Sequence, residues 1–247
     1  MFSLIVMRMS GAIGVNPIFG SSNMPSRVKA SFILVLSLVL YTGFDGTLQH
    51  EPTTMLEYGV MLVGELLFGI VLSFAMELSI MAVRFASSVM DYVMGLNMAQ
   101  IYDPQYRTQM TISSGMYYAF IILLFFSTNG HLRLLSIFYD SAYQIPFGTV
   151  SLRPELAQAM LSAFEEGIML GVQLAFPLIA MEMVAETAVG IMMRMIPQIN
   201  VFSVNFQLKI IIGLGMMVFL FSPLADKLNM ILDNIYQSLQ QIVVLMT

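Results

Sequence analysis

Charged side chains inside long apolar runs are the residues of this sequence that could do chemistry. Glu182, Glu186 and Arg194 are separated by four and eight residues, so a helix would place them on one face. In a membrane such a face could carry protons or line a pore, because lipid cannot satisfy ionised groups. It could also form ion pairs with a neighbouring subunit, and two glutamates one turn apart require nearby partners. We favour the subunit contact.

A second polar stripe lies within residues 82–107. Helical spacing aligns Arg84, Ser88, Asp91 and Gly95 on one side of a cylinder. Arg84 and Asp91 are two helical turns apart, so each is expected to find its partner on another helix. Lipid tails cannot satisfy this stripe, and we predict that it faces protein, water or a pore, with Arg84 and Asp91 as subunit contacts.

Other kinds of chemistry are poorly supported. His50 and His131 are too few for a metal site and lack carboxylates at suitable spacing. The sequence contains no nucleophile elbow, phosphate-binding glycine loop or HExxH motif. Gly213 and Gly215 lie inside an apolar run, where close helix packing explains them better than nucleotide binding. We therefore predict no enzyme activity, no catalytic residues, no metal and no cofactor.

The polar stripes are positioned by a series of apolar segments. We expect these at residues 2–19, 28–41, 55–83 (continuing through the second stripe with at most a kink), 103–130, 153–195 and 201–221, followed by an amphipathic tail at 224–246. Asp103 suits the N-cap and Pro104 the first turn of the fourth helix. Pro177 is the expected kink in the fifth. We find no strand alternation and no repeat of fixed period.

Composition places the chain in or against a membrane. Hydrophobic residues make up 58% of the 247 positions and charged residues 10%, whereas soluble domains have about 25% charged residues. The net charge of −5 has no block of one sign, which argues against a nucleic-acid partner. Arg27 and Lys29 are expected on the cytoplasmic side. Arg8 lies inside the first apolar run, so no cleavable signal peptide is predicted and an upstream extension is expected to be missing.

These features predict an all-α, membrane-associated fold of long, kinked helical hairpins in one domain, residues 1–247. The segment at 28–41 is about 14 residues long, whereas a full hydrocarbon span needs about 20. Short segments, interrupting prolines and buried charges suit tilted hairpins within a larger assembly better than a simple stack of spanning helices.

Four ordered motifs resemble the FliR family of flagellar type III export proteins and its injectisome counterparts, the SctT family. The first is Arg8 and Asn16-Pro17-Ile18, followed by Met24-Pro25-Ser26-Arg27-Val28-Lys29. The second is Ala82-Val83-Arg84 leading to Gly95-Leu96-Asn97-Met98 and Asp103-Pro104. The third is Asn129-Gly130-His131, and the fourth runs from Arg194-Met195-Ile196-Pro197 to Gln198-Ile199-Asn200. Asn97 departs from the family's usual Gln, and the segment between Met98 and Asp103 is shorter than in some members.

The resemblance implies a non-enzymatic subunit of an export gate in the bacterial inner membrane, at the flagellar basal body. There it would assemble with FliP-like and FliQ-like subunits into a helical cone, beside FlhB-like and FlhA-like components and in contact with membrane lipid. Unfolded flagellar proteins would pass through the channel, and the subunit would be required for flagellum assembly.

The resemblance also implies a loop that helps to block the closed channel. It maps onto residues 98–106, and the candidate plug residues are Met98, Ile101, Tyr102, Asp103, Pro104 and Tyr106. Soft, flexible side chains such as methionine can fill a narrow lumen and still yield to varied cargo. Sealing would then be steric and would not require binding of any one sequence.

Three alternatives remain open at this point. An injectisome subunit of the same family would share all of these features. An ion-coupled small-molecule transporter could use Glu65, Glu77, Glu182 and Glu186 as proton carriers, although the sequence has no internal repeat. A passive scaffold without a lumen-facing role is the third.

Overall fold

The computed structural model describes residues 1–247 except 21–23, 44–47, 49–50, 99, 104–107, 151–152, 196–200 and 247. The side chains of residues 98, 101–103, 108 and 201–204 also lie outside the description. The chain forms two compact units from separate segments. The first contains Met1–Ile80, Phe125–Glu165 and Leu232–Thr247, and the second contains Met81–Leu124 and Glu166–Ile231. Each unit is described by itself.

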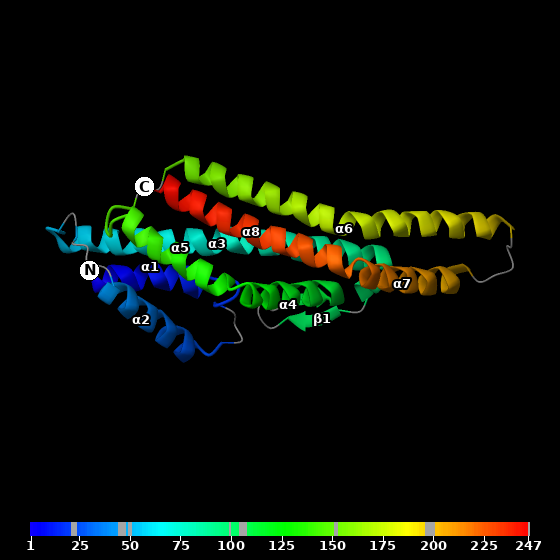
Figure 1. The fold of residues 1–247 in the computed structure, drawn as a ribbon, viewed down its shortest axis with the longest axis horizontal. Helices are drawn as coiled ribbons and strands as arrows, with labels where there is room; N and C mark the ends of the chain where they lie inside the picture. Colours follow the sequence, from blue (N-terminus) through cyan, green and yellow to red (C-terminus); the bar gives the residue numbers. More distant parts are fainter. Residues whose placement is uncertain are drawn as a thin grey trace. The chain divides into compact units, whose positions relative to one another are not determined.

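Long α-helices dominate the fold and confirm the predicted all-α class (Figure 1). The helices are α1 (Phe2–Gly14), α2 (Ser26–Gly43), α3 (Met55–Met94), α4 (Ile112–Ser127), α5 (Gly130–Gln144), α6 (Glu155–Met195), α7 (Val201–Phe219) and α8 (Phe221–Leu245). As predicted, α3 continues from its apolar run into the second polar stripe, as far as Met94. The helix α6 contains Pro177, and the kink expected there stays a prediction. The helix α2 extends beyond the predicted 14 residues to 18.

The predicted start of the fourth helix at Asp103-Pro104 is wrong. Gly95 adopts a positive φ of 78° and ends α3, and a 3-10 turn, η1 (Leu96–Met98), follows. Two short antiparallel strands, β1 (Gln100–Asp103) and β2 (Thr108–Thr111), then form a hairpin, and α4 starts at Ile112. The β-branched and aromatic residues of this stretch favour extended backbone. Strand pairing therefore prevails over the helix start that Asp-Pro suggested.

In the first unit, α1 and α3 cross at two glycines. A Cβ added to Gly11 would lie 2.8 Å from the backbone nitrogen of Ile70, and one added to Gly69 would lie 2.5 Å from that of Ala12. Small residues let two helices in a membrane approach this closely and gain dispersion contacts along their length. The crossing fixes α1 against the middle of α3.

In the second unit, α7 packs on α3 through Gly213, where an added Cβ would overlap the side chain of Met94. The predicted role of this glycine in close packing is confirmed. Gly215 differs, because no atom lies within 4 Å of a Cβ built there. Gly171 of α6 similarly approaches the backbone of Ala82 on α3.

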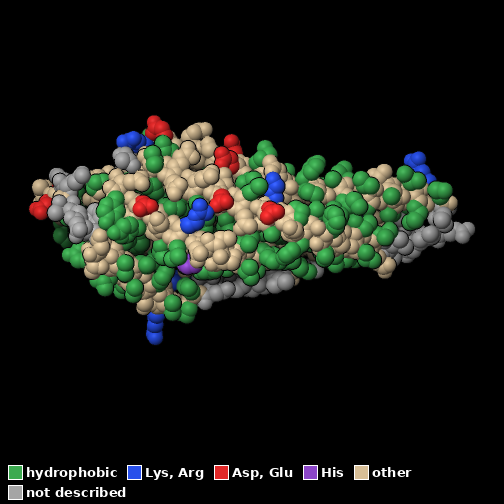
Figure 2. All heavy atoms as spheres, in the orientation of Figure 1, with side chains coloured by type: hydrophobic (Ala, Val, Ile, Leu, Met, Phe, Trp, Pro, Cys, Tyr) green, Lys and Arg blue, Asp and Glu red, His purple; other side chains and the backbone are tan. Residues whose placement is uncertain are grey.

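Several elements of the described chain are long and apolar enough to cross a membrane. The helices α2, α3 and α6 qualify individually. The pair α4 and α5, bent by 71°, and the pair Asn205–Phe219 with α8, bent by 66°, qualify if each is one broken span. The first bend falls at Asn129-Gly130, where the segment predicted at 103–130 ends, and Asn129 is left-handed. Figure 2 shows hydrophobic side chains spread over the face drawn, with few charged ones.

Candidate functional site

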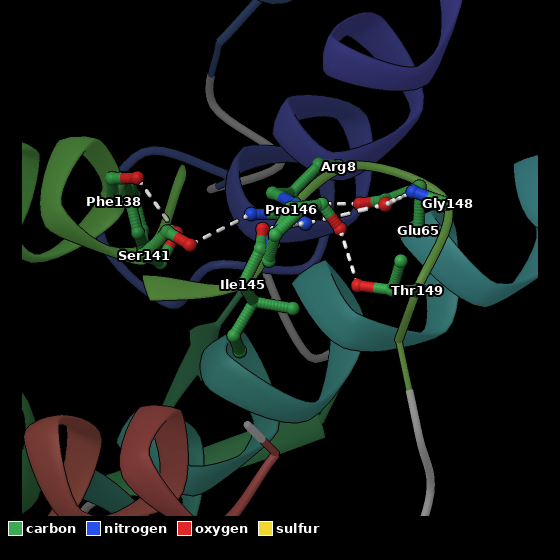
Figure 3. A network of polar contacts seen from close by, with 8 residues as sticks. All are labelled: Arg8, Glu65, Phe138, Ser141, Ile145, Pro146, Gly148 and Thr149. Atoms are coloured by element: carbon green, nitrogen blue, oxygen red, sulfur yellow. Dashed lines mark hydrogen bonds and ion pairs between the residues drawn. The ribbon is translucent and has the colours of Figure 1, made fainter. Parts of the chain in front are cut away.

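Within the described residues, an extensive buried polar network joins Arg8 of α1 to Glu65 of α3 (Figure 3). The two side chains are 1% and 0% exposed. The guanidinium donates from Nε to one carboxylate oxygen at 2.6 Å and from an Nη to the other at 3.2 Å. This bidentate geometry is the strongest arrangement available to an arginine–carboxylate pair.

The same network holds the segment that follows α5. Arg8 also donates to the backbone carbonyl oxygens of Ser141 and Ile145, each at 3.1 Å, and the Gly148 backbone N–H donates to Glu65 at 2.8 Å. The rings of Phe68 and Phe147 lie 4.6 and 4.3 Å from the guanidinium carbon, within range for a cation–π contact. The buried charge pair thus joins α1, α3 and the stretch from Ser141 to Gly148.

The sequence marked both partners but did not pair them. Arg8 stood out as a charge within an apolar run, and Glu65 was a candidate proton carrier. Both carboxylate oxygens of Glu65 accept hydrogen bonds in the folded chain, which gives this residue a structural partner and weakens its case as a carrier.

Asp91 of the second polar stripe is 0% exposed and binds the start of α4. Its carboxylate accepts from the Ser113 backbone N–H at 2.7 Å and from the Ser113 hydroxyl. An acceptor at this place satisfies a backbone donor that α4 cannot satisfy itself and complements the positive helix end. The expected partner on another helix is therefore present within the same chain, and the predicted contact of this stripe with a neighbouring subunit stays a prediction.

Arg84, the other charged residue of this stripe on α3, also contacts α4. Its guanidinium carbon lies 4.1 Å from the centre of the Tyr118 ring. The stripe on α3 is thus turned towards α4 within the second unit, and both of its charged residues have neighbours there.

The stripe on α6 is only partly brought together. Glu186 accepts from Lys209 of α7 at 3.1 Å, and Arg194 is exposed near the end of α6. Glu182 is 1% exposed, and neither of its carboxylate oxygens has a hydrogen-bond partner within the described residues. A Cβ added to Gly213 would lie 3.2 Å from one carboxylate oxygen of Glu182, so glycine at this position leaves room for the carboxylate. The proposed contact with another subunit stays a prediction for these three residues.

The candidate plug residues fall on the hairpin between α3 and α4. Met98 ends the η1 turn, and Ile101, Tyr102 and Asp103 belong to β1, opposite Met110, Gln109 and Thr108. The structure describes the backbone of these four but not their side chains, and Pro104 and Tyr106 lie outside the described residues. The described part of the predicted plug therefore contains the end of η1 and the strand β1, which pairs with β2 between the apolar helices α3 and α4.

Comparison with known proteins identifies the family. The family model described as "Bacterial export proteins, family 1" matches residues 1–235. "Flagellar biosynthetic protein FliR" of Escherichia coli (strain K12) is 27% identical over 238 residues, which cover 96% of this chain and 90% of that protein. The proteins of the same name from Bacillus subtilis (strain 168) and Aquifex aeolicus are both 28% identical, over 88% and 80% of this chain and 84% and 76% of theirs. The resemblance to FliR is confirmed, and the chain belongs to the family of bacterial export proteins, family 1.

Proposed function

We propose that this chain is a subunit of the flagellar type III protein export gate, and that it helps to form and seal the channel for unfolded flagellar proteins. The observation that carries the proposal is the match to the export family over residues 1–235. The name FliR on relatives that cover nearly the whole chain favours the flagellar system over an injectisome. The role is structural and non-catalytic, in the inner membrane at the basal body.

Sealing is assigned to the β1–β2 hairpin. The hairpin connects α3 to α4, and Asp91 holds the first residues of α4 through Ser113. This anchoring supports a hairpin that is held in position at its base. Met98, Ile101 and Tyr102 supply apolar bulk that can block ions and yet yield to a passing polypeptide.

Assembly with other subunits is supported by exposed apolar surface on α6 and α7. Met183, Val184 and Met195 of α6 are exposed, as are Ile211 and Val218 of α7. Exposed apolar surface of this extent marks a protein or lipid contact. We assign it to FliP-like and FliQ-like neighbours, with Glu182, Glu186 and Arg194 among the polar contacts. FlhB-like and FlhA-like components would join the same assembly.

A conductance measurement tests the sealing role. Met98, Ile101 and Tyr102 are replaced together by glycine in the assembled complex, which is then reconstituted into a planar bilayer. We expect a steady leak of small ions, because the apolar bulk of the hairpin is removed while the rest of the chain is unchanged. Replacing Gln100 and Gln109 by glycine is the matched control, since it adds backbone freedom to the same hairpin but removes no apolar bulk.

Two outcomes would contradict the proposal. Unchanged conductance in the triple variant would show that this hairpin does not seal the channel, and it would favour a passive scaffold. A chain that purifies as a defined monomer or dimer, without FliP-like subunits, would favour the transporter. Loss of flagella after deletion of the gene, with rescue by the wild-type chain, tests the requirement for flagellum assembly.

A further inference from the structure

An apolar groove lies between α2 and α5, with α1 as its floor. Its volume is about 300 Å³. Buried Met9, Leu40 and Phe138 line its base, and Leu36, Leu132 and Tyr139 line its sides. The outer face of α2 is also apolar, because Leu34, Val35 and Leu38 are exposed. The groove therefore adjoins an apolar helix surface whose exposure to water is unfavourable.

The two ends of α2 differ in chemistry. Arg27 and Lys29 lie in its first turn, and its sequence contains no acidic residue. At the other end, the hydroxyls of Tyr139 and Tyr143 both donate to the carbonyl oxygen of Gly43, at 3.2 and 3.1 Å. These bonds tie α5 to the end of α2 and close the groove on that side. Cations at one end and tyrosine hydroxyls at the other are typical of the two interfaces of a membrane.

Lys29 does not line the groove itself, but it lies on the side of α2 that faces the groove. Leu36 and Leu40 follow it by seven and eleven residues, a spacing that places all three on one side of a helix. The Lys29 ammonium donates to the Gly20 carbonyl oxygen at 2.6 Å, which leaves two of its three protons for another acceptor. Arg27 lies at the same level on the opposite side.

The distances match one leaflet of a bilayer. A rise of 1.5 Å per residue gives roughly 27 Å for the 18 residues of α2, close to a hydrocarbon core of about 30 Å. Leu36 and Leu40 lie roughly 10 and 16 Å along the helix from Lys29. A leaflet is about 15 Å deep, so an acyl chain with its headgroup at Lys29 would end beside these leucines.

We propose that this groove holds one acyl chain of an anionic phospholipid whose phosphate is bound by Lys29. A phospholipid combines an anionic head with an apolar tail, in the order and separation that Lys29 and the groove present. A helix from another subunit would fill the groove but would give no role to Lys29, one leaflet depth away on the same side of α2. The proposal needs the chain to be embedded in a membrane and does not depend on the export role.

Native mass spectrometry tests the site. The full chain, with the subunits that co-purify with it, is exchanged into nanodiscs of phosphatidylglycerol or of phosphatidylcholine and then released in the gas phase. We expect the wild-type chain to retain one phosphatidylglycerol, with at least a tenfold preference over phosphatidylcholine, as for a hydrogen bond to a charged group. Lys29→Gln should lose this preference, and Lys29→Arg should keep it.

A second pair of variants separates the tail from the head. Leu36→Trp fills the groove and should abolish retention of either lipid, whereas Leu38→Trp on the exposed face of α2 should behave as the wild type. Arg27→Gln removes the same charge at the same level from the opposite side and should leave the preference intact. Equal retention of both lipids by the wild-type chain, retention by Leu36→Trp, or a partner helix cross-linked into the groove would overturn the proposal.

Discussion

The Arg8–Glu65 pair makes the sharpest prediction about stability, because its two partners can be removed separately and together. Replacing Glu65 by leucine leaves a guanidinium that is 1% exposed without its counter-ion. Replacing Arg8 by methionine leaves a carboxylate that is 0% exposed and keeps the N–H of Gly148 as a donor. Removing one member of a buried pair costs about 3–5 kcal/mol, because the other charge stays buried.

The double variant Arg8→Met/Glu65→Leu should cost much less than either single change. No charge remains buried, and apolar replacement of a buried pair is often neutral. The carbonyl oxygens of Ser141 and Ile145 lose their donor, however, which we expect to cost about 1–3 kcal/mol. The coupling energy between the two substitutions should therefore be at least about 3 kcal/mol.

Unfolding of the full chain in mixed detergent micelles, followed by helical circular dichroism, measures these free energies. The surface pair Arg133–Asp233 is the matched control, since its atoms are 2.8 Å apart but its side chains are 59% and 58% exposed. Asp233→Asn should change the free energy of unfolding by less than about 1 kcal/mol. If Glu65→Leu costs no more than Asp233→Asn, or if the single effects simply add in the double variant, the network does not hold this unit together.

Three further substitutions test the packing and the remaining buried carboxylates. Gly11→Ala should lower the free energy of unfolding by separating α1 from α3, whereas Gly14→Ala, where an added Cβ meets nothing within 4 Å, should be tolerated; thermal unfolding compares the two. Asp91→Asn should destabilise the start of α4 by about 1–3 kcal/mol, seen as faster amide hydrogen exchange near Ser113, and unchanged exchange would refute the cap. Glu182→Gln should leave the free energy of unfolding equal or higher, because it removes a buried charge without a partner in the described chain; a large loss of stability would show that a partner exists.

The helices could be predicted because their apolar runs are long and continuous. The 40 residues of α3 form one uninterrupted pattern, and Asn129-Gly130 marks a stop that the left-handed Asn129 confirms. The hairpin was missed because Asp103-Pro104 is equally suited to a helix start. Four residues per strand are too few for alternation to be recognised in the sequence.

The polar contacts were harder to predict, since they join residues far apart in the chain. Arg8 was conspicuous, but its partner Glu65 is 57 positions away. Nothing in the sequence distinguishes Glu65 from Glu57 or Glu77 as the carboxylate that pairs with Arg8. Asp91 was expected to need a partner on another helix, yet nothing in the sequence singled out Ser113, 22 positions later. Helix spacing predicts the face on which a charge lies, whereas the choice of its partner depends on how the helices pack.

Cross-linking to a stalled export substrate tests the central claim most directly. The chain contains no cysteine, so Ile101→Cys in the hairpin and Leu38→Cys on the exposed face of α2 each introduce one thiol. In cells that still assemble flagella, a substrate halted in transit and carrying a thiol-reactive probe should cross-link to the hairpin cysteine and not to the one on α2. Absence of the hairpin cross-link, or equal cross-linking at both positions, would contradict a channel sealed by this hairpin.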